Sequence, residues 1–399
     1  MKIHGMGTAL PSLSVTQEVS AEIANGICCE NDQQRRLLST LYRRTGVKSR
    51  HSVLLESDSD ASLDGSDVSS AAVGAAATNG TGAQVGGTQV VEPQPASSAT
   101  LLDRANQSFY WPANNATDRG PTTAQRLVAY RDHGEGLAVE ASQQAFADCD
   151  VRPDEITHLV TISCTGFHAP GVDIALIRQL GLPATVSRTN VGFMGCHGAM
   201  NGLRVAKAYA DADPNARVLV VAVELCSLHQ QYGWEPQRIV SNSLFADGAA
   251  AVIGSGSDKA EAEQVTLTSS YSAIIPDTEE MMSWAIGDNG FEMYLSAEVP
   301  DVIRRATREP LDKWLNQSGL SLAEIQSWAI HPGGPRILDA CGESLSLSES
   351  DLDASRSVLS RCGNMSSPTV LFVLNELLSS GQKPPTLMLG FGPGLAMEA

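Results

Sequence analysis

The sequence lacks long apolar runs. No stretch approaches the roughly 18 consecutive apolar residues that a membrane-spanning helix needs, so no span is expected. The opening residues, MKIHGMGTALPS, contain no apolar core of the kind found in secretory signal peptides, and we expect none here.

Basic residues are also scarce. The chain has 27 Lys and Arg against 45 Asp and Glu, which gives a formal net charge of −18 and a pI near 4.8. Such a negative field repels phosphate backbones and anionic membranes, so a general nucleic-acid partner is excluded. A local basic patch can still bind a polyanion.

Paired cysteines are missing as well. The eight cysteines are scattered, and no two are spaced as CxxC. Cys28 and Cys29 are adjacent, which suits neither a zinc site nor an ordinary disulfide. We therefore expect reduced thiols, no metal and a cytoplasmic location.

One segment has almost no large apolar residues. Glu56–Thr100 consists mainly of Ser, Ala, Gly and Asp. Burial in such a segment cannot offset the entropy lost on ordering, so we predict a disordered, low-complexity insertion at 56–100. The full chain of 399 residues is long enough, and at 42% hydrophobic apolar enough, for a large core.

The remaining chain has an α/β pattern. Short runs rich in β-branched residues predict strands, and longer runs with a small-residue or apolar face predict helices. The strands are predicted at 156–163, 217–224, 249–256, 325–331 and 386–391, and the helices at 198–212, 300–318 and 366–380.

Two segments resemble each other. DEITHLVTISCTG (Asp154–Gly166) and AEIQSWAIHPGG (Ala323–Gly334) both lead through Glu-Ile into a strand and a glycine-containing loop. This similarity favours two related α/β halves, at residues 1–260 and 261–399. A site built from corresponding loops of both halves would follow.

The stretch VGFMGCHGAMNG places Cys196 between a predicted strand and a predicted helix. The positive end of a helix dipole lowers the pKa of a thiol, and the flanking glycines permit a sharp turn. On this segment alone, Cys196 is a nucleophile, a metal ligand or a small core residue. His197 is adjacent, but neighbouring side chains at a helix start point in different directions.

Two other segments combine a reactive side chain with glycines. His331 lies in IHPGGP at the end of a predicted strand, and Asn364 lies in CGNMSSP before a predicted helix. Taken alone, His331 could be structural and Asn364 could be a helix N-cap.

These motifs occur in a recognisable order. The GC turn, FADGAAAVIGSG, HPGGPRIL, GNMSSPTVLFVL and GFGPGLAME together resemble the type III polyketide synthases, the chalcone and stilbene synthase family, in a bacterial form. The resemblance covers nearly the whole chain except Glu56–Thr100. It implies a thiolase-like fold with two halves in an αβαβα stack, and a homodimer. It also implies an acyl-CoA starter, malonyl-CoA as extender and no separate carrier protein, so that CoA thioesters are the substrates and no cofactor is expected.

The resemblance also implies roles for residues. Cys196 resembles the acyl-carrying nucleophile, His331 the catalytic histidine and Asn364 its partner. A thiolate can attack a starter thioester, and hydrogen bonds from His331 and Asn364 can stabilise the enolate left when malonyl-CoA loses CO₂.

CoA contacts are expected in the basic segment Arg35–His51. By similarity to the family, Arg44, Lys48 and Arg50 are candidates for binding the phosphates, although a solvated basic face is the alternative. Gly333 and Gly334 would let the pantetheine arm approach the backbone.

Pocket positions are assigned by the same resemblance. Phe245 and Met293 match two positions that gate the CoA tunnel. The remaining candidates for the pocket wall are Cys164, Thr165, Cys226, His229 and Ser366. Cys164, Thr165, Cys226 and His229 depart from the residues usual in chalcone synthases, as does Ala169. A pyrone or resorcinol product from a fatty acyl-CoA is therefore expected at least as much as a chalcone.

Two other readings stay open. A ketoacyl carrier-protein synthase of the initiating type also uses Cys, His and Asn, although HPGG is not its usual histidine context. A non-catalytic acyl-CoA-binding protein of the same fold is the other.

Overall fold

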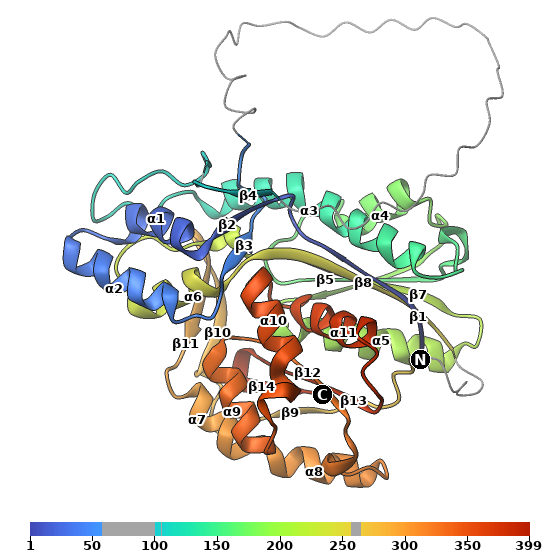
Figure 1. Cartoon of the computed structure of the whole chain (residues 1–399). Helices are drawn as coiled ribbons and strands as arrows, with labels where there is room; N and C mark the ends of the chain where they lie inside the picture. Colours follow the sequence, from blue (N-terminus) through green and yellow to red (C-terminus); the bar gives the residue numbers. More distant parts are fainter. Residues whose placement is uncertain (58–99, 105, 257–264) are drawn as a thin grey trace, which may run out of the picture.

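The structure is a computed structural model that describes residues 1–57, 100–104, 106–256 and 265–399 (Figure 1). The predicted insertion at 56–100 lies almost wholly outside the described residues.

The first sheet has the strand order β1 (Lys2–Ala9), β8 (Asp247–Ser255), β7 (Arg217–Leu225), β5 (His158–Ser163) and β6 (Ser187–Gly192). Strand β5 pairs in parallel with β6 and β7, whereas β8 is antiparallel to β7 and β1. The residues of β8 are all buried, and those of β7 nearly all. Continuous apolar runs are typical of strands covered on both faces, which explains why these strands were predictable.

Helices cover both faces of this sheet. Helix α3 (Thr123–Ala147) packs on β1, β8 and β7 and against α4 (Val172–Leu180). On the opposite face lie α5 (Gly198–Ala212) and α11 (Thr369–Ser379), whose apolar side chains share one core with the sheet. The bounds of α5 are those predicted from the sequence.

A second sheet lies beyond α5 and α11. Its order is β12 (Ser327–Ile330), β13 (Thr386–Gly392), β14 (Ala396–Glu398) and β9 (Ser272–Ile274).

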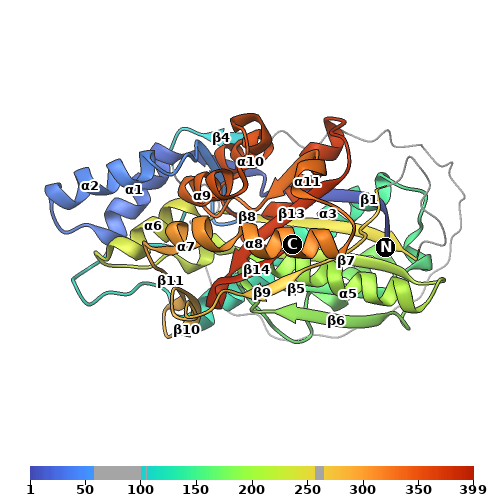
Figure 2. The same cartoon turned by 90° about the horizontal axis from the view of Figure 1, so that it is seen from below.

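Its outer side is covered by α7 (Val299–Ala306), α8 (Arg308–Gln317) and α9 (Pro335–Leu345), while α10 (Asp353–Cys362) packs on α11. Figures 1 and 2 show the resulting αβαβα layers, as predicted.

The two similar segments fold alike. In one, the 3-10 turn η2 (Pro153–Glu155) leads into β5, and in the other η5 (Leu322–Glu324) leads into β12. The proposed boundary between residues 260 and 261 falls among residues that the structure does not describe, and it stays a prediction.

One helix prediction needs correction. The segment 300–318 forms two helices, α7 and α8, that meet at Thr307. Pro310 has no N–H to donate to the preceding turn, so a single continuous helix cannot keep all its hydrogen bonds here.

Further elements lie beside the layered core and were not predicted. They are α1 (Gln17–Cys28), α2 (Asp32–Arg43), α6 (Pro236–Leu244), the small sheet of β2 (Leu13–Thr16), β3 (Ser49–His51) and β4 (Thr100–Leu102), and the hairpin of β10 (Met282–Gly287) and β11 (Gly290–Leu295). Several of these elements contribute walls of the site described next.

Candidate active site

Cys196 lies in a tight turn between β6 and α5. Phe193 and Gly195 have φ values of 58° and 76°, and Cys196 sits in a 3-10 turn (Gly195–His197) that leads into the helix. A Cβ atom at Gly195 would lie 2.2 Å from Cδ of Pro393. Glycine is therefore required for the GFGPG loop of the second half to pack against the turn that carries Cys196.

The thiol of Cys196 is buried, and burial raises its pKa to about 11. Hydrogen bonds from Ser366 and Asn364 act in the opposite direction, and the nearby carboxylate of Glu224 raises the pKa further. The sequence-based expectation of a lowered pKa is wrong for this structure. The loss of water around the sulfur is the largest cause of the raised pKa.

Asn364 is buried in the loop between α10 and α11 and pairs with the turn that follows α6. Its N–H donates to the carbonyl of Leu244, and its carbonyl accepts from the N–H of Ala246, both at 2.9 Å. Its Oδ1 accepts from the N–H of Ser366 at 2.8 Å, which leaves the amide NH₂ to donate toward the sulfur of Cys196. Asn364 is not an N-cap, because α11 begins at Thr369.

His331 follows β12, and its N–H donates to the carbonyl of Leu389 at 2.7 Å. The ring is buried, and neither ring nitrogen has a hydrogen-bond partner among the described residues. Burial, assisted by His197, lowers the pKa of His331 to about 3, so the ring is neutral. A neutral imidazole offers one donor and one acceptor, and leaving both unpaired in the interior is costly unless a ligand uses them.

One pocket brings these groups together. Cys196, His331 and Asn364 line the same cavity, together with Phe245 and Met293. The other lining residues are Ser241, Leu244, Met282, Leu295, Gly333, Ile337 and Phe391. Three motifs from distant parts of the sequence therefore meet at one largely apolar site.

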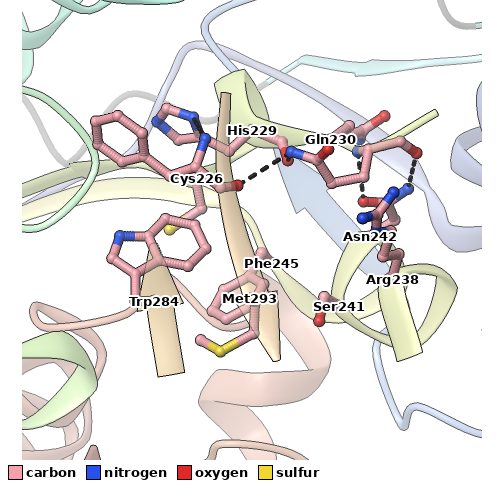
Figure 3. Close-up of a pocket in the computed structure, with 11 residues that line it drawn as sticks. Cys226, His229, Gln230, Arg238, Ser241, Asn242, Phe245, Trp284 and Met293 are labelled. Carbon is pink, nitrogen blue, oxygen red and sulfur yellow. Dashed lines mark hydrogen bonds between the residues drawn. The ribbon is translucent and has the colours of Figure 1, made fainter. Parts of the chain in front are cut away.

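A second pocket adjoins the first and shares Ser241, Phe245 and Met293 with it. Figure 3 shows Phe245 and Met293 together, near Cys226 and Trp284. Phe245 and Met293 therefore stand where the two pockets meet, and their role in gating a CoA tunnel stays a prediction.

His229 forms part of the wall of this second pocket. Its Nε2 donates to the carbonyl of Thr165 at 2.6 Å, and its Nδ1 accepts from the N–H of Phe291 at 3.0 Å. The ring stacks on Phe291 with 4.3 Å between centroids, and burial lowers the pKa of His229 to about 3. With both nitrogens engaged, His229 is a rigid wall rather than a base.

Glu224 is a buried carboxylate that sequence reasoning missed. It accepts hydrogen bonds from Ser367 Oγ at 2.6 Å, Thr165 Oγ1 at 2.7 Å and the N–H of Cys164 at 2.9 Å. Burial raises its pKa. A single acidic residue near the end of an apolar strand, RVLVVAVE, was the signal available in the sequence.

Cys164 and Thr165 lie behind the wall of the site. The sulfur of Cys164 accepts from the N–H of Gly195 at 3.0 Å, so it supports the nucleophile turn. Neither residue lines the pocket of Cys196 or the pocket of His229, nor does Ser366, and the place of all three in the substrate pocket stays a prediction. Trp284 and Phe291, which do line the second pocket, were not expected.

The candidates for CoA binding separate into two groups. Arg44 and Lys48 are exposed, whereas Arg50 is 4% exposed. Arg50 Nη1 donates to the carbonyls of Asn242 at 2.6 Å and Phe245 at 3.0 Å. A buried guanidinium that already binds two backbone carbonyls is a poor ligand for a CoA phosphate, so the structure favours a structural role for Arg50.

The two glycines after His331 also differ. Gly333 lines the pocket with Cys196, and a Cβ there would lie 3.9 Å from Nε2 of His331. Gly334 is not among the lining residues. It precedes α9 with a φ of 155°, which favours glycine.

Within the described ranges, no helix is both long and apolar enough to cross a membrane. The same part of the chain contains no group of three or more His, Cys, Asp or Glu side chains that could hold a metal ion.

Comparisons with known proteins agree with this architecture. Models of the N-terminal and C-terminal domains of chalcone and stilbene synthases match residues 112–258 and 266–399.

An alpha-pyrone synthesis polyketide synthase-like protein of Mycobacterium tuberculosis is 38% identical over 288 residues, which are 70% of this chain and 73% of that protein. The 1,3,6,8-tetrahydroxynaphthalene synthase of Streptomyces peucetius is 35% identical over 279 residues, 69% of this chain and 74% of that enzyme. The crystal structure of a polyketide synthase from the brown alga Ectocarpus siliculosus matches with a TM-score of 0.80 and 26% identity, covering 100% of this chain and 97% of that one.

The two α/β halves in αβαβα layers form a thiolase-like fold, with the cysteine, histidine and asparagine between them. The chain belongs to the chalcone and stilbene synthase family and is a type III polyketide synthase, an acyltransferase.

Proposed function

We propose that this enzyme loads an acyl-CoA starter on Cys196 and extends it with units from malonyl-CoA. The observation that carries the proposal is the single buried pocket in which Cys196, His331 and Asn364 meet. CoA thioesters are then the substrates, and no separate cofactor is needed.

The first proposed step is transfer of the starter acyl group from CoA to Cys196, with Cys196 and His331 both uncharged at the start. His331 takes the proton of Cys196, and the thiolate attacks the starter carbonyl. A new carbon–sulfur bond forms, the old one breaks, and CoA leaves as a thiol with that proton.

Decarboxylation follows in the same pocket. Malonyl-CoA loses CO₂, and the electron pair moves onto the thioester oxygen as an enolate. The amide NH₂ of Asn364 and an N–H of His331 donate to that oxygen. The enolate carbon then attacks the acyl group on Cys196, so a carbon–carbon bond forms and the thiolate is released.

Repeated extension and cyclisation to a pyrone or resorcinol complete the proposed reaction. The mycobacterial relative is named for alpha-pyrone synthesis, which supports a pyrone. The pocket beyond Phe245, with Cys226 and Met293 in its wall, provides a place for the growing chain.

Arg44 and Lys48 are the proposed contacts of the CoA phosphates, because both are exposed and basic in an acidic protein. Gly333, beside the ring of His331, is proposed to let the pantetheine arm pass close to the backbone.

A homodimer is also proposed. Strand β6 ends the first sheet, and Phe167, Met194 and Ile286 are exposed apolar side chains. Met194 follows β6, while Phe167 and Ile286 adjoin Phe291, whose ring also contacts Phe193 just after β6. An open strand edge with an apolar patch favours pairing with a second copy. The cytoplasmic location stays a prediction.

The test uses purified protein, isotope-labelled malonyl-CoA and a panel of medium-chain, long-chain and aromatic acyl-CoAs, with product masses as the readout. We expect label in products and in released CO₂. Consumption of malonyl-carrier protein but not malonyl-CoA would indicate the ketoacyl synthase alternative. No consumption of either extender with any starter would indicate a binding protein.

Replacing Asn364 by Asp should strongly slow malonyl-CoA decarboxylation, because a carboxylate is an acceptor where a donor is needed. Loss of one such donor raises the barrier by roughly 3–4 kcal/mol, which is a rate loss of about a hundredfold to a thousandfold. The control is Asn316→Asp, the same change at an exposed site on α8. Decarboxylation retained by Asn364→Asp would remove Asn364 from this role.

A further inference from the structure

The short strand β3 carries a buried cation that has no carboxylate among its hydrogen-bond partners. The guanidinium of Arg50 lies 5.5 Å from the centre of the Tyr42 ring, and its Nε has no partner in the described structure. Its hydrogen bonds go to backbone carbonyls. Burying the charge of Arg50 costs free energy, which indicates that its hydrogen bonds to the backbone have a structural role.

Arg50 holds the end of helix α6. The carbonyls of Asn242 and Phe245 lie at the C-terminus of this helix, where carbonyls lack partners within the helix and the dipole favours a cation. One Nη1 binds both. The segment fixed in this way contains Phe245, which lines the pocket of Cys196.

The residues before Arg50 hold the end of α10. The N–H of Lys48 donates to the carbonyl of Ser360, and Ser49 Oγ donates to the carbonyl of Arg361, both at 2.8 Å. These carbonyls lie in the last turn of α10, just before Gly363 and Asn364.

Gly363 lies where the C-terminal end of α10 contacts the C-terminal end of α6. Its φ is 74°, and a Cβ there would lie 3.3 Å from Cγ of Arg50 and 3.1 Å from the carbonyl oxygen of Leu244. The stem of Arg50 is therefore packed where the end of α10 meets the end of α6. At that place the backbone of Asn364 pairs with Leu244 and Ala246.

We propose that Lys48–Arg50, which we call the β3 clamp, holds Asn364 and Phe245 in fixed positions relative to each other. In this proposal Arg50 is a positioning residue for decarboxylation. The clamp binds the C-terminal ends of α6 and α10 from one side, while the backbone pairing of Asn364 with the turn after α6 joins these two helix ends directly. Arginine suits this place because its planar fork spans two carbonyls, which an ammonium reproduces poorly. The kinetic part of the proposal rests on the proposed role of Asn364.

The first test is the kinetics of malonyl-CoA decarboxylation by Arg50→Met, which keeps most of the packed stem. We expect kcat to fall by about tenfold to a hundredfold, as for a small misplacement of a catalytic group, with KM for malonyl-CoA nearly unchanged. The control, Arg305→Met on α7, removes an exposed arginine and should leave both constants unchanged. A raised KM with kcat retained would make Arg50 a CoA ligand and overturn the clamp.

A double-mutant cycle separates positioning from general loss of stability. If Arg50 acts through Asn364, Arg50→Met should slow decarboxylation in the wild type but not in an Asn364→Ala background. Equal losses in both backgrounds would overturn the proposal. If Arg50→Met does not fold, two milder variants replace it. Arg50→Lys weakens the contact with the end of α6, and Ser49→Ala weakens the contact with the end of α10. Both should lower kcat rather than raise KM.

Hydrogen exchange tests the clamp without any activity. The amides of Ala246 and Asn364 donate the pairing bonds, so peptides containing them should lose protection in Arg50→Met but not in Arg305→Met. Unchanged protection would overturn the clamp. Inactivity of the wild-type enzyme toward malonyl-CoA would instead count against the proposed function and leave this exchange result decisive for the clamp.

Discussion

At the scale of single residues, the side chains of Cys196 and His331 are both buried and both uncharged. Burial raises the pKa of Cys196 to about 11 and lowers that of His331 to about 3. Forming a thiolate therefore requires help from the donors of Ser366 and Asn364 and from the arriving substrate. A neutral resting thiol also protects the nucleophile from oxidation, because the thiolate is the reactive form.

This protonation state predicts how Cys196 is alkylated. The thiolate fraction of a thiol rises about tenfold per pH unit below its pKa, so inactivation by iodoacetamide should accelerate by about that factor per unit between neutral and mildly alkaline pH. The rate is measured as loss of condensing activity, and labelling of a Cys196→Ala variant gives the background from the other cysteines. A rate that is already flat near neutral pH would mean that a thiolate–imidazolium pair exists in the resting enzyme.

At the scale of elements, the β10–β11 hairpin supplies side chains to both pockets. Trp284 lies opposite Met293 in the strand register, and Met282 lies opposite Leu295. The indole N–H of Trp284 donates to the carbonyl of Cys164 at 2.7 Å, and its ring meets those of His229 and Phe291 edge-on. Trp284 is therefore fixed as a wall of the second pocket.

Shortening this wall should change the product. Trp284→Ala removes the ring from the pocket shared by Cys226 and Phe245, so we expect longer products from the same starter, seen as added malonyl-derived units by mass spectrometry. Trp284→Phe, which keeps a ring, should preserve the length. An unchanged product distribution in Trp284→Ala would show that this pocket does not hold the growing chain.

The elements also show which sequence signals were sufficient. Buried strands β7 and β8 and helix α5 were predicted because apolar runs and small-residue faces are local patterns. The hairpin was missed, since its strands mix buried, half-buried and exposed residues without a clear alternation. The division between α7 and α8 was missed because the prediction of one helix at 300–318 took no account of Pro310.

At the scale of the whole molecule, the open edge of β6 predicts the assembly. We expect light scattering to give twice the 42.1 kDa mass of the chain. Phe167, which is 51% exposed, lies beside this edge, so Phe167→Arg should lower the measured mass. Leu37→Arg, at a similarly exposed site on α2, is the matched control. A wild-type mass equal to one chain would contradict the homodimer.

The sequence by itself determined the family, the layered fold and the three residues of the proposed site. The motifs around Cys196, His331 and Asn364 are short contiguous stretches, so they can be recognised without knowledge of tertiary contacts. Only the tertiary structure decided the pKa of Cys196, the interior place of Arg50 and the hydrogen bonds of Cys164 with Gly195 and of Thr165 with Glu224. These properties depend on how much water surrounds a group and on partners far away in sequence, and neither is encoded by the spacing of residues.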